Sequence, residues 1–248
     1  MIKEIVSRTT TQPARVAYRR IRLLLDRRRN ARRELADVFA RIYAQGRWGG
    51  EDGDFVSGYG SDDDLATDYV GAVVSFIRSQ GIGSLVDLGC GDFRVARSIL
   101  RSLDDRISYV GVDIVPALIE RNRNLFGSER VRFVCKDITR DHLPDGELCL
   151  VRQVLQHLSN AEIADALVGV RGYRYALITE HYPAPERVRR PNLDKPHGGD
   201  TRVVDGSAVF LDKAPFGLAG VELVQETEVN PPLIAKGETL KTWLIQQQ

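Results

Sequence analysis

Apolar residues follow two alternating patterns along the chain: short continuous runs, and longer segments in which they recur every third or fourth position. The short runs predict buried strands, and the longer segments predict helices with one buried face. In the stretch SLVDLGCGDFRVARSIL (84–100), a run at 85–88 precedes a helical pattern at 95–100. The same succession recurs further on, with strands predicted within 106–114, 131–138, 147–158 and 175–182, and helices at 116–126 and 161–169.

This alternation of strands and helices predicts right-handed βαβ units and a parallel sheet with helices on both faces. The end of the chain differs, because two strand-like runs, VELVQETEV and LKTWLIQQ, are joined by a turn-rich segment, residues 230–238. Two such runs predict an antiparallel hairpin at one edge of the sheet. The sequence therefore predicts an α/β fold.

The first 45 residues form a separate pattern. Between about 14 and 45, apolar residues at helical spacing alternate with arginines, which predicts one long helix or two short ones. Residues 46–63 are rich in glycine and aspartate, a composition typical of a loop, and we expect this loop to close over a ligand. We therefore divide the chain into a basic helical extension, 1–45, and a catalytic domain, 46–248.

Composition limits the classes of protein that the chain fits. Its 248 residues, 43% of them hydrophobic, are enough for the core of one α/β domain. No segment approaches roughly 18 consecutive apolar residues, and the N-terminus lacks the apolar core of a signal peptide, so we expect a cytoplasmic protein. The three cysteines lack metal-ligand or disulfide spacing.

The net charge of +1 conceals an uneven distribution. A cluster of arginines near the N-terminus could bind anionic headgroups, which raises a second prediction: peripheral contact with the inner face of the membrane. The alternative is that this amphipathic helix packs on its own domain or on a second subunit. The cluster comprises Arg15, Arg19, Arg20, Arg22, Arg27, Arg28, Arg29, Arg32 and Arg33.

Acidic residues mark the ends of three successive predicted strands. Asp87 with Gly89 and Gly91 follows the first, and Asp113 and Asp137 follow the next two. Ligands of open α/β sheets bind beyond these strand ends, the glycines allow a close approach of the backbone, and an acid about 20 residues on suits a ribose. The pattern predicts a site for an adenosine-containing cofactor.

The third glycine of dinucleotide-binding sites is missing. Arg94 occupies its place, and Asp92 would put a negative charge where a pyrophosphate should lie. This weakens the interpretation of the chain as a nicotinamide-dependent dehydrogenase, and it favours a cationic ligand.

Four segments together resemble the motifs of class I S-adenosylmethionine-dependent methyltransferases: VDLGCGD, YVGVDI, FVCKDI and VRQVLQHLS. The resemblance covers most of the chain from about Trp48 onward. It implies a Rossmann-like, mostly parallel seven-stranded sheet with an antiparallel C-terminal hairpin, and S-adenosylmethionine as the cofactor. More narrowly, WGGEDGDFVSGYGSD, CGDF, DIVPALIERNR, NLDKPHGG and APFGL resemble a bacterial subgroup associated with glycan and secondary-metabolite biosynthesis.

The resemblance also implies roles for individual residues. Gly89, Cys90 and Gly91 would line the methionine part of the cofactor, and Asp113, followed by Ile114, would hold the ribose hydroxyls. Asp137 and Ile138 would meet the adenine, Gln153 would touch the sulfonium end, and Asp87 belongs to the first motif. Residues 57–61, with Tyr59, would close over the cofactor.

Transfer of a methyl group to a hydroxyl requires a base, and histidine suits this role near neutral pH. His157 and His181 follow the fourth and fifth predicted strands, so both are candidate general bases. Glu180 would either orient an imidazole or end its strand in solvent. No clear ligand set for a metal is present, and we predict none, although some sugar O-methyltransferases use a divalent metal.

The leading hypothesis is O-methylation of a small polar acceptor, such as a sugar or glycan precursor. One alternative is an RNA methyltransferase that uses the arginines on phosphates. The near-neutral total charge and the lack of a recognisable RNA-binding module argue against a nucleic-acid partner. Another alternative is a protein that binds S-adenosylmethionine or a partner without catalysis. The sequence leaves the acceptor, the methylated atom and the oligomeric state open.

Overall fold

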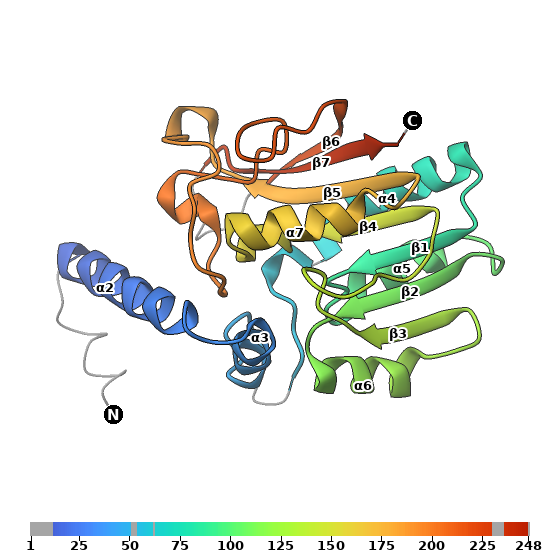
Figure 1. Ribbon diagram of the computed structural model, residues 1–248, viewed down its shortest axis with the longest axis horizontal. Helices are drawn as coiled ribbons and strands as arrows, with labels where there is room; N and C mark the ends of the chain where they lie inside the picture. Colours follow the sequence, from blue (N-terminus) through green and yellow to red (C-terminus); the bar gives the residue numbers. More distant parts are fainter. Residues whose placement is uncertain (1–11, 51–53, 62, 230–235, 248) are drawn as a thin grey trace.

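The computed structural model describes residues 12–50, 54–61, 63–229 and 236–247. Its centre is a seven-stranded sheet in the order β3-β2-β1-β4-β5-β7-β6. The first five strands are parallel, and β7 pairs antiparallel with both β5 and β6 (Figure 1). This confirms the predicted parallel sheet, the C-terminal hairpin and the Rossmann-like methyltransferase fold. The strands are β1 (Ser84–Leu88), β2 (Ser108–Asp113), β3 (Val131–Cys135), β4 (Leu148–Arg152), β5 (Tyr175–Tyr182), β6 (Val221–Glu228) and β7 (Thr239–Gln246).

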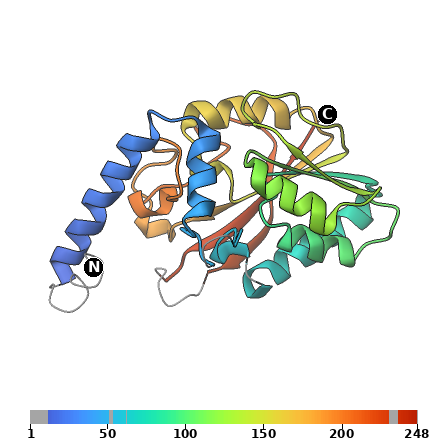
Figure 2. The same cartoon turned by 90° about the horizontal axis from the view of Figure 1, so that it is seen from below.

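The central strands are apolar because both of their faces are covered by helices. β1 and β4 are almost fully buried, and their side chains alternate between two hydrophobic clusters, one on each face of the sheet. Helices α4 (Asp63–Gln80) and α5 (Arg94–Arg101) cover one face, and α3 (Leu35–Ala44) and α7 (Asn160–Val170) cover the other (Figure 2). The helix α6 (Pro116–Phe126) lies along β2 and β3.

Helix boundaries follow local sequence signals. In α7 the side chain of Ser159 accepts a hydrogen bond from the backbone N–H of Glu162, and the Glu162 carboxylate accepts one from the backbone N–H of Ser159. This reciprocal capping satisfies two N–H groups that a helix start leaves unpaired. Pro116 occupies the first turn of α6, where its missing N–H costs nothing. Short 3-10 turns complete the chain at η1 (Tyr59–Ser61), η2 (Leu155–His157), η3 (Pro185–Arg187) and η4 (Arg202–Asp205).

The N-terminal segment forms two helices, which answers the choice left open by the sequence. Helix α2 (Gln12–Asn30) projects beside residues 185–205, and Arg27 binds Asp200 with Nη2 2.7 Å from Oδ2 (Figures 1 and 2). The same nitrogen lies 2.5 Å from Asp205 Oδ2. Among the described residues, no helix combines the length and the apolar character needed to cross a membrane.

Helix α3 packs into the main body of the protein. Leu35, Val38, Phe39, Ile42 and Tyr43 are buried in the same cluster as β1 and β4. The boundary that we predicted at residue 45 therefore falls after a helix whose side chains belong to the core of the sheet.

Candidate active site

A cavity of about 590 Å³ opens at the carboxyl ends of the parallel strands, where the strand-end acids were expected to meet. Its wall includes residues from β1, β2, β4 and β5, and from helix α3 and the loop before η1. This volume lies within the range of small-molecule sites. Ten predicted site residues line it: Asp87, Gly89, Cys90, Gly91, Asp113, Ile114, Ile138, Gln153, His157 and His181.

The two glycines of the first turn are required by close packing. Both have positive φ angles, +77° for Gly89 and +53° for Gly91. A Cβ at Gly89 would lie 2.4 Å from Cγ2 of Val154, and one at Gly91 would lie 2.3 Å from Oγ of Ser57. A side chain at either position would therefore be strained and would clash.

Asp113 is held at the end of β2 by backbone donors. Its Oδ2 accepts the N–H of Gly91 and its Oδ1 accepts the N–H of Val115, each at 3.1 Å. Burial raises the pKa of Asp113 to about 6, although these hydrogen bonds favour the charged form. Burial also raises the pKa of Asp87 to about 6, against a hydrogen bond of 2.8 Å from the hydroxyl of Tyr109.

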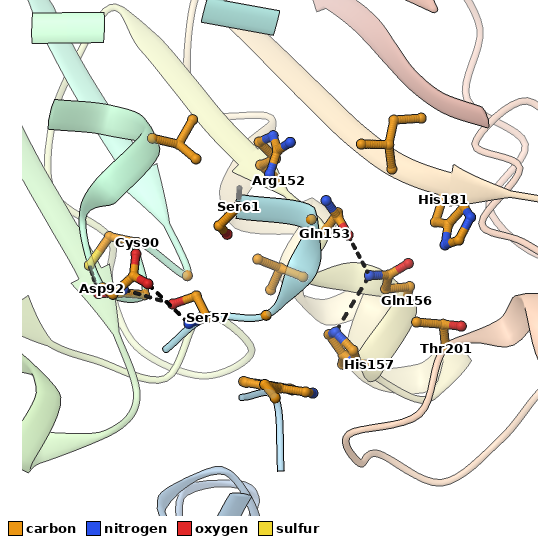
Figure 3. Close-up of a pocket in the computed structure, with 18 of the residues that line it drawn as sticks. Ser57, Ser61, Cys90, Asp92, Arg152, Gln153, Gln156, His157, His181 and Thr201 are labelled. Atoms are coloured by element: carbon orange, nitrogen blue, oxygen red, sulfur yellow. Dashed lines mark hydrogen bonds between the residues drawn. The ribbon is translucent and has the colours of Figure 1, made fainter. Parts of the chain in front are cut away.

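The loop before η1 is fastened to the first turn. The backbone N–H of Ser57 donates to Asp92 Oδ2 at 3.0 Å, and the N–H of Asp92 donates to Oγ of Ser57 at 2.8 Å (Figure 3). The hydroxyl of Tyr43, on α3, lies 3.2 Å from the same Oγ. Helix α3, the loop and the glycine turn thus form one continuous wall, and the contribution of Tyr43 had no signal in the sequence beyond its helical spacing.

The loop also reaches the end of β4. Gln153 has a φ of +56°, and its backbone turns the chain from β4 into η2. A Cβ on Gly60 would lie 2.1 Å from Nε2 of Gln153, so a larger residue here would force the Gln153 amide to move. Tyr59 belongs to η1, but its side chain lies outside the described part of the structure.

Asp137 occupies a different position from the other acids. Strand β3 ends at Cys135, two residues before the predicted end, and Asp137 lies in the following turn. Its Oδ1 accepts hydrogen bonds from the backbone N–H and the hydroxyl of Thr139, at 2.9 and 2.7 Å. The adjacent residues Lys136 and Ile138 line the cavity, whereas Asp137 does not.

The two histidines have different surroundings. His157 Nδ1 lies 3.1 Å from the carbonyl oxygen of Gly198, so Nδ1 carries the proton and donates it. Burial and the nearby Lys195 lower the pKa of His157 to about 4. Its Nε2 lies 3.5 Å from the side-chain amide of Gln156 (Figure 3).

His181 lies on β5, and its Nε2 is 3.0 Å from Oε2 of Glu238. Burial lowers the pKa of His181 to about 4, whereas a carboxylate at this distance favours the protonated ring. Arg187 Nη1 is 3.9 Å from Oε1 of the same glutamate. Glu238 was not singled out in the sequence.

We expected Glu180 either to orient an imidazole or to end its strand in solvent, and the structure shows neither. It is 1% exposed, and its two oxygens accept the backbone N–H groups of residues 154–156 at 2.8 to 3.2 Å. Glu180 therefore fixes the turn that carries His157. Cys90 lines the cavity, and burial raises the pKa of its thiol well above the ordinary value, which disfavours a nucleophilic role.

Comparison with known proteins agrees with this geometry. Residues 85–172 match a family model described as a methyltransferase domain. A search of curated proteins finds no match. The N-methyltransferase NodS from Bradyrhizobium japonicum WM9, crystallised with S-adenosylhomocysteine, has a TM-score of 0.56 at 10% identity, over 86% of this chain and 100% of that chain.

Two further solved structures are similar. The Burkholderia thailandensis 1,6-didemethyltoxoflavin N1-methyltransferase, also with bound S-adenosylhomocysteine, has a TM-score of 0.52 at 17% identity, over 86% of this chain and 88% of that chain. The carbon methyltransferase CurJ has a TM-score of 0.50 at 13% identity; the match covers 75% of this chain and 56% of that longer chain. At these identities the likeness shows the fold.

The fold is that of class I methyltransferases, and a methyltransferase-domain model matches residues 85–172. Beyond that matched segment, the solved structures show the likeness of the fold. The cavity suits S-adenosylmethionine, a ligand with cationic groups, because two buried acids, Asp87 and Asp113, line it. The described residues contain no group of three His, Cys, Asp or Glu side chains arranged to hold a metal ion.

Proposed function

We propose that the protein methylates a hydroxyl group of a small polar acceptor, with a sugar or glycan precursor as the favoured class. The observation that carries this proposal is the presence of two neutral histidines in the cavity, one of them paired with a carboxylate. The subgroup resemblance of the sequence supports the glycan class. The proteins compared above are named as nitrogen and carbon methyltransferases, so the proposed oxygen acceptor rests on the histidines.

In the proposed pose, Asp113 accepts the ribose hydroxyls, Ile114 and Ile138 lie at the adenine, and Gly89, Cys90 and Gly91 line the methionine part. Gln153 and the loop with Tyr59 close over the sulfonium end. Unlike Asp87 and Asp113, Asp137 does not line the cavity, and its Oδ1 accepts the hydrogen-bond donors of Thr139. We therefore propose that Asp137 stabilises the turn at the adenine end, and that this turn places Lys136 and Ile138 in the cavity wall.

When bound, S-adenosylmethionine supplies an electrophilic methyl group: the acceptor oxygen bonds to its carbon as the bond to sulfur breaks, leaving S-adenosylhomocysteine and a proton. The proton requires a base. Burial lowers the pKa of both histidines to about 4, so protonating either ring costs about 3 kcal/mol relative to a free histidine, and in His157 the nearby Lys195 adds to this cost. His181 suits the role better, because Glu238 stabilises the imidazolium that forms.

The test is methyl transfer to a panel of nucleotide sugars and methyl glycosides, with the position of the new methyl group found by NMR. His181→Ala should lower turnover by roughly 100-fold or more while affinity for S-adenosylhomocysteine stays within about twofold. His142→Ala, on an exposed loop, is the matched control and should have no effect. A methyl group on nitrogen or carbon would refute the proposed acceptor, and loss of turnover in His157→Ala alone would move the base to His157.

We also propose that α2 docks on an anionic membrane surface, which would bring lipid-linked acceptors to the enzyme. Support comes from an apolar stripe on α2, in which Tyr18, Ile21, Leu24 and Leu25 are each between 48% and 58% exposed. Exposed arginines flank this stripe, and alternating apolar and cationic residues suit a lipid interface better than a phosphate backbone. The flanking arginines are Arg20, Arg22, Arg28 and Arg29.

A further inference from the structure

The guanidinium of Arg152 is a largely buried charge, and two of its three nitrogens make no hydrogen bond within the described part of the chain. Arg152 is the last residue of β4 and lines the cavity (Figure 3). Within the described part of the chain, its Nε and Nη2 have neither solvent contact nor a hydrogen-bond acceptor. Its guanidinium carbon lies 4.9 Å from the centre of the Tyr69 ring. An aromatic face replaces only part of the hydration that a buried cation loses.

The nearest carboxylates are engaged elsewhere. Asp87 and Glu180 lie close enough to Arg152 to favour its charged form. However, Asp87 Oδ2 accepts the hydroxyl of Tyr109, and Glu180 accepts three backbone N–H groups. A buried arginine without a bonded anion is costly, so its donors point to an anionic group that a ligand brings.

The strand register locates this group. Leu88 of β1 pairs with Val151 of β4, and the next residues along the two strands are Gly89 and Arg152. Gly89 begins the turn that, in the cofactor pose proposed above, lines the methionine part. The open donors of Arg152 therefore lie beside the end of the cofactor that carries a carboxylate.

From this geometry we infer that Arg152 binds the carboxylate of the methionine moiety of S-adenosylmethionine, an inference that rests on the cofactor pose proposed above. A guanidinium offers two parallel N–H donors that match a carboxylate. Asp87, in the same cavity, supplies a negative charge for the neighbouring ammonium. The pair thus complements both charges of the amino-acid end.

The test compares two ligands that differ in one group: S-adenosylmethionine and decarboxylated S-adenosylmethionine. Calorimetry on the full chain should show that the intact protein prefers the carboxylated ligand by roughly 10- to 100-fold. Arg152→Met should abolish this preference by weakening the carboxylated ligand alone, and Arg152→Lys should keep part of it. Arg132→Met, which removes an exposed strand arginine outside the cavity, should change nothing.

A thermal melt without ligand separates a binding role from a structural one. Because Nε and Nη2 of Arg152 have no hydrogen-bond acceptor to lose, and methionine avoids the cost of burying a charge while still packing against Tyr69, Arg152→Met should unfold at the same temperature as the parent or at a higher one. Equal weakening of both ligands by Arg152→Met, unchanged affinity for the carboxylated ligand, or a lower melting temperature would each overturn the inference. If the intact protein bound neither S-adenosylmethionine nor S-adenosylhomocysteine, the cofactor pose itself would be wrong, which is a different failure.

Discussion

The affinity of the protein for S-adenosylhomocysteine should fall as the pH is lowered through about 6. Burial raises the pKa of Asp113 to about 6. Ionising this carboxyl in the cavity therefore costs about 3 kcal/mol more than in water. Ribose hydroxyls donate to the ionised form, so binding is strongest above this pKa and is lost below it.

The magnitude follows from the fraction ionised. At about pH 5 only about one-tenth of Asp113 is ionised, so the affinity should be about tenfold lower than at about pH 7.5. Asp87, whose pKa is also raised to about 6, adds to the fall if it meets the ammonium of the ligand. Isothermal titration calorimetry across this range measures the dissociation constant directly.

Asp113→Asn is the matched variant, because it keeps the shape of the side chain and removes its titration. At about pH 7.5 it should bind S-adenosylhomocysteine roughly 10- to 100-fold more weakly, and its affinity should depend less on pH than that of the parent. Titration of the ligand or of Asp87 would persist in this variant. A pH dependence equal to that of the parent would refute the assignment of Asp113.

Two further predictions concern the glycine turn and α2. Gly91→Ala should weaken S-adenosylhomocysteine binding and lower stability, because its Cβ would meet Ser57, whereas Gly71→Ala, with open space around it, should stabilise α4 by about 0.5–1 kcal/mol. Denaturant unfolding measures the stability of each variant and calorimetry measures its affinity, and the same change in stability for the two variants would contradict the packing argument. Replacing Leu24 and Leu25 by serine should abolish co-sedimentation with anionic liposomes at low salt without changing cofactor affinity; a parent protein that does not sediment with those liposomes would contradict membrane docking.

The sequence was a good guide wherever the chemistry is local to a strand end. Parallel strands share one edge of the sheet for their carboxyl ends, so Asp87 and Asp113 had to meet once the strands were recognised. Asp137 shows the limit of this rule. Strand β3 ends at Cys135, and in the following turn the carboxylate of Asp137 accepts a hydrogen bond from the backbone N–H of Thr139. The apolar pattern of the strand does not predict this hydrogen bond.

Contacts between distant segments could not be derived in the same way. The antiparallel pairing of β5 and β7 sets His181 opposite Leu240, and this places Glu238 at the imidazole. The hairpin itself was predictable, but its register depends on which faces become buried. The apolar face of α3 likewise indicated a buried helix, without indicating that Tyr43 would reach the cavity wall.

By itself, the sequence determined the order of strands and helices, the glycine turn and its acids, because hydrophobic periodicity and turn chemistry act over a few neighbouring residues. Only the tertiary structure decided which buried polar groups have a hydrogen-bond partner. Arg152 looks like an ordinary residue at the end of a strand, and its open donors become apparent only when Asp87 and Glu180 are seen to bond elsewhere. Whether a buried charge has a partner depends on all of its neighbours at once, and these come from β1, β5 and α4, which only folding brings together.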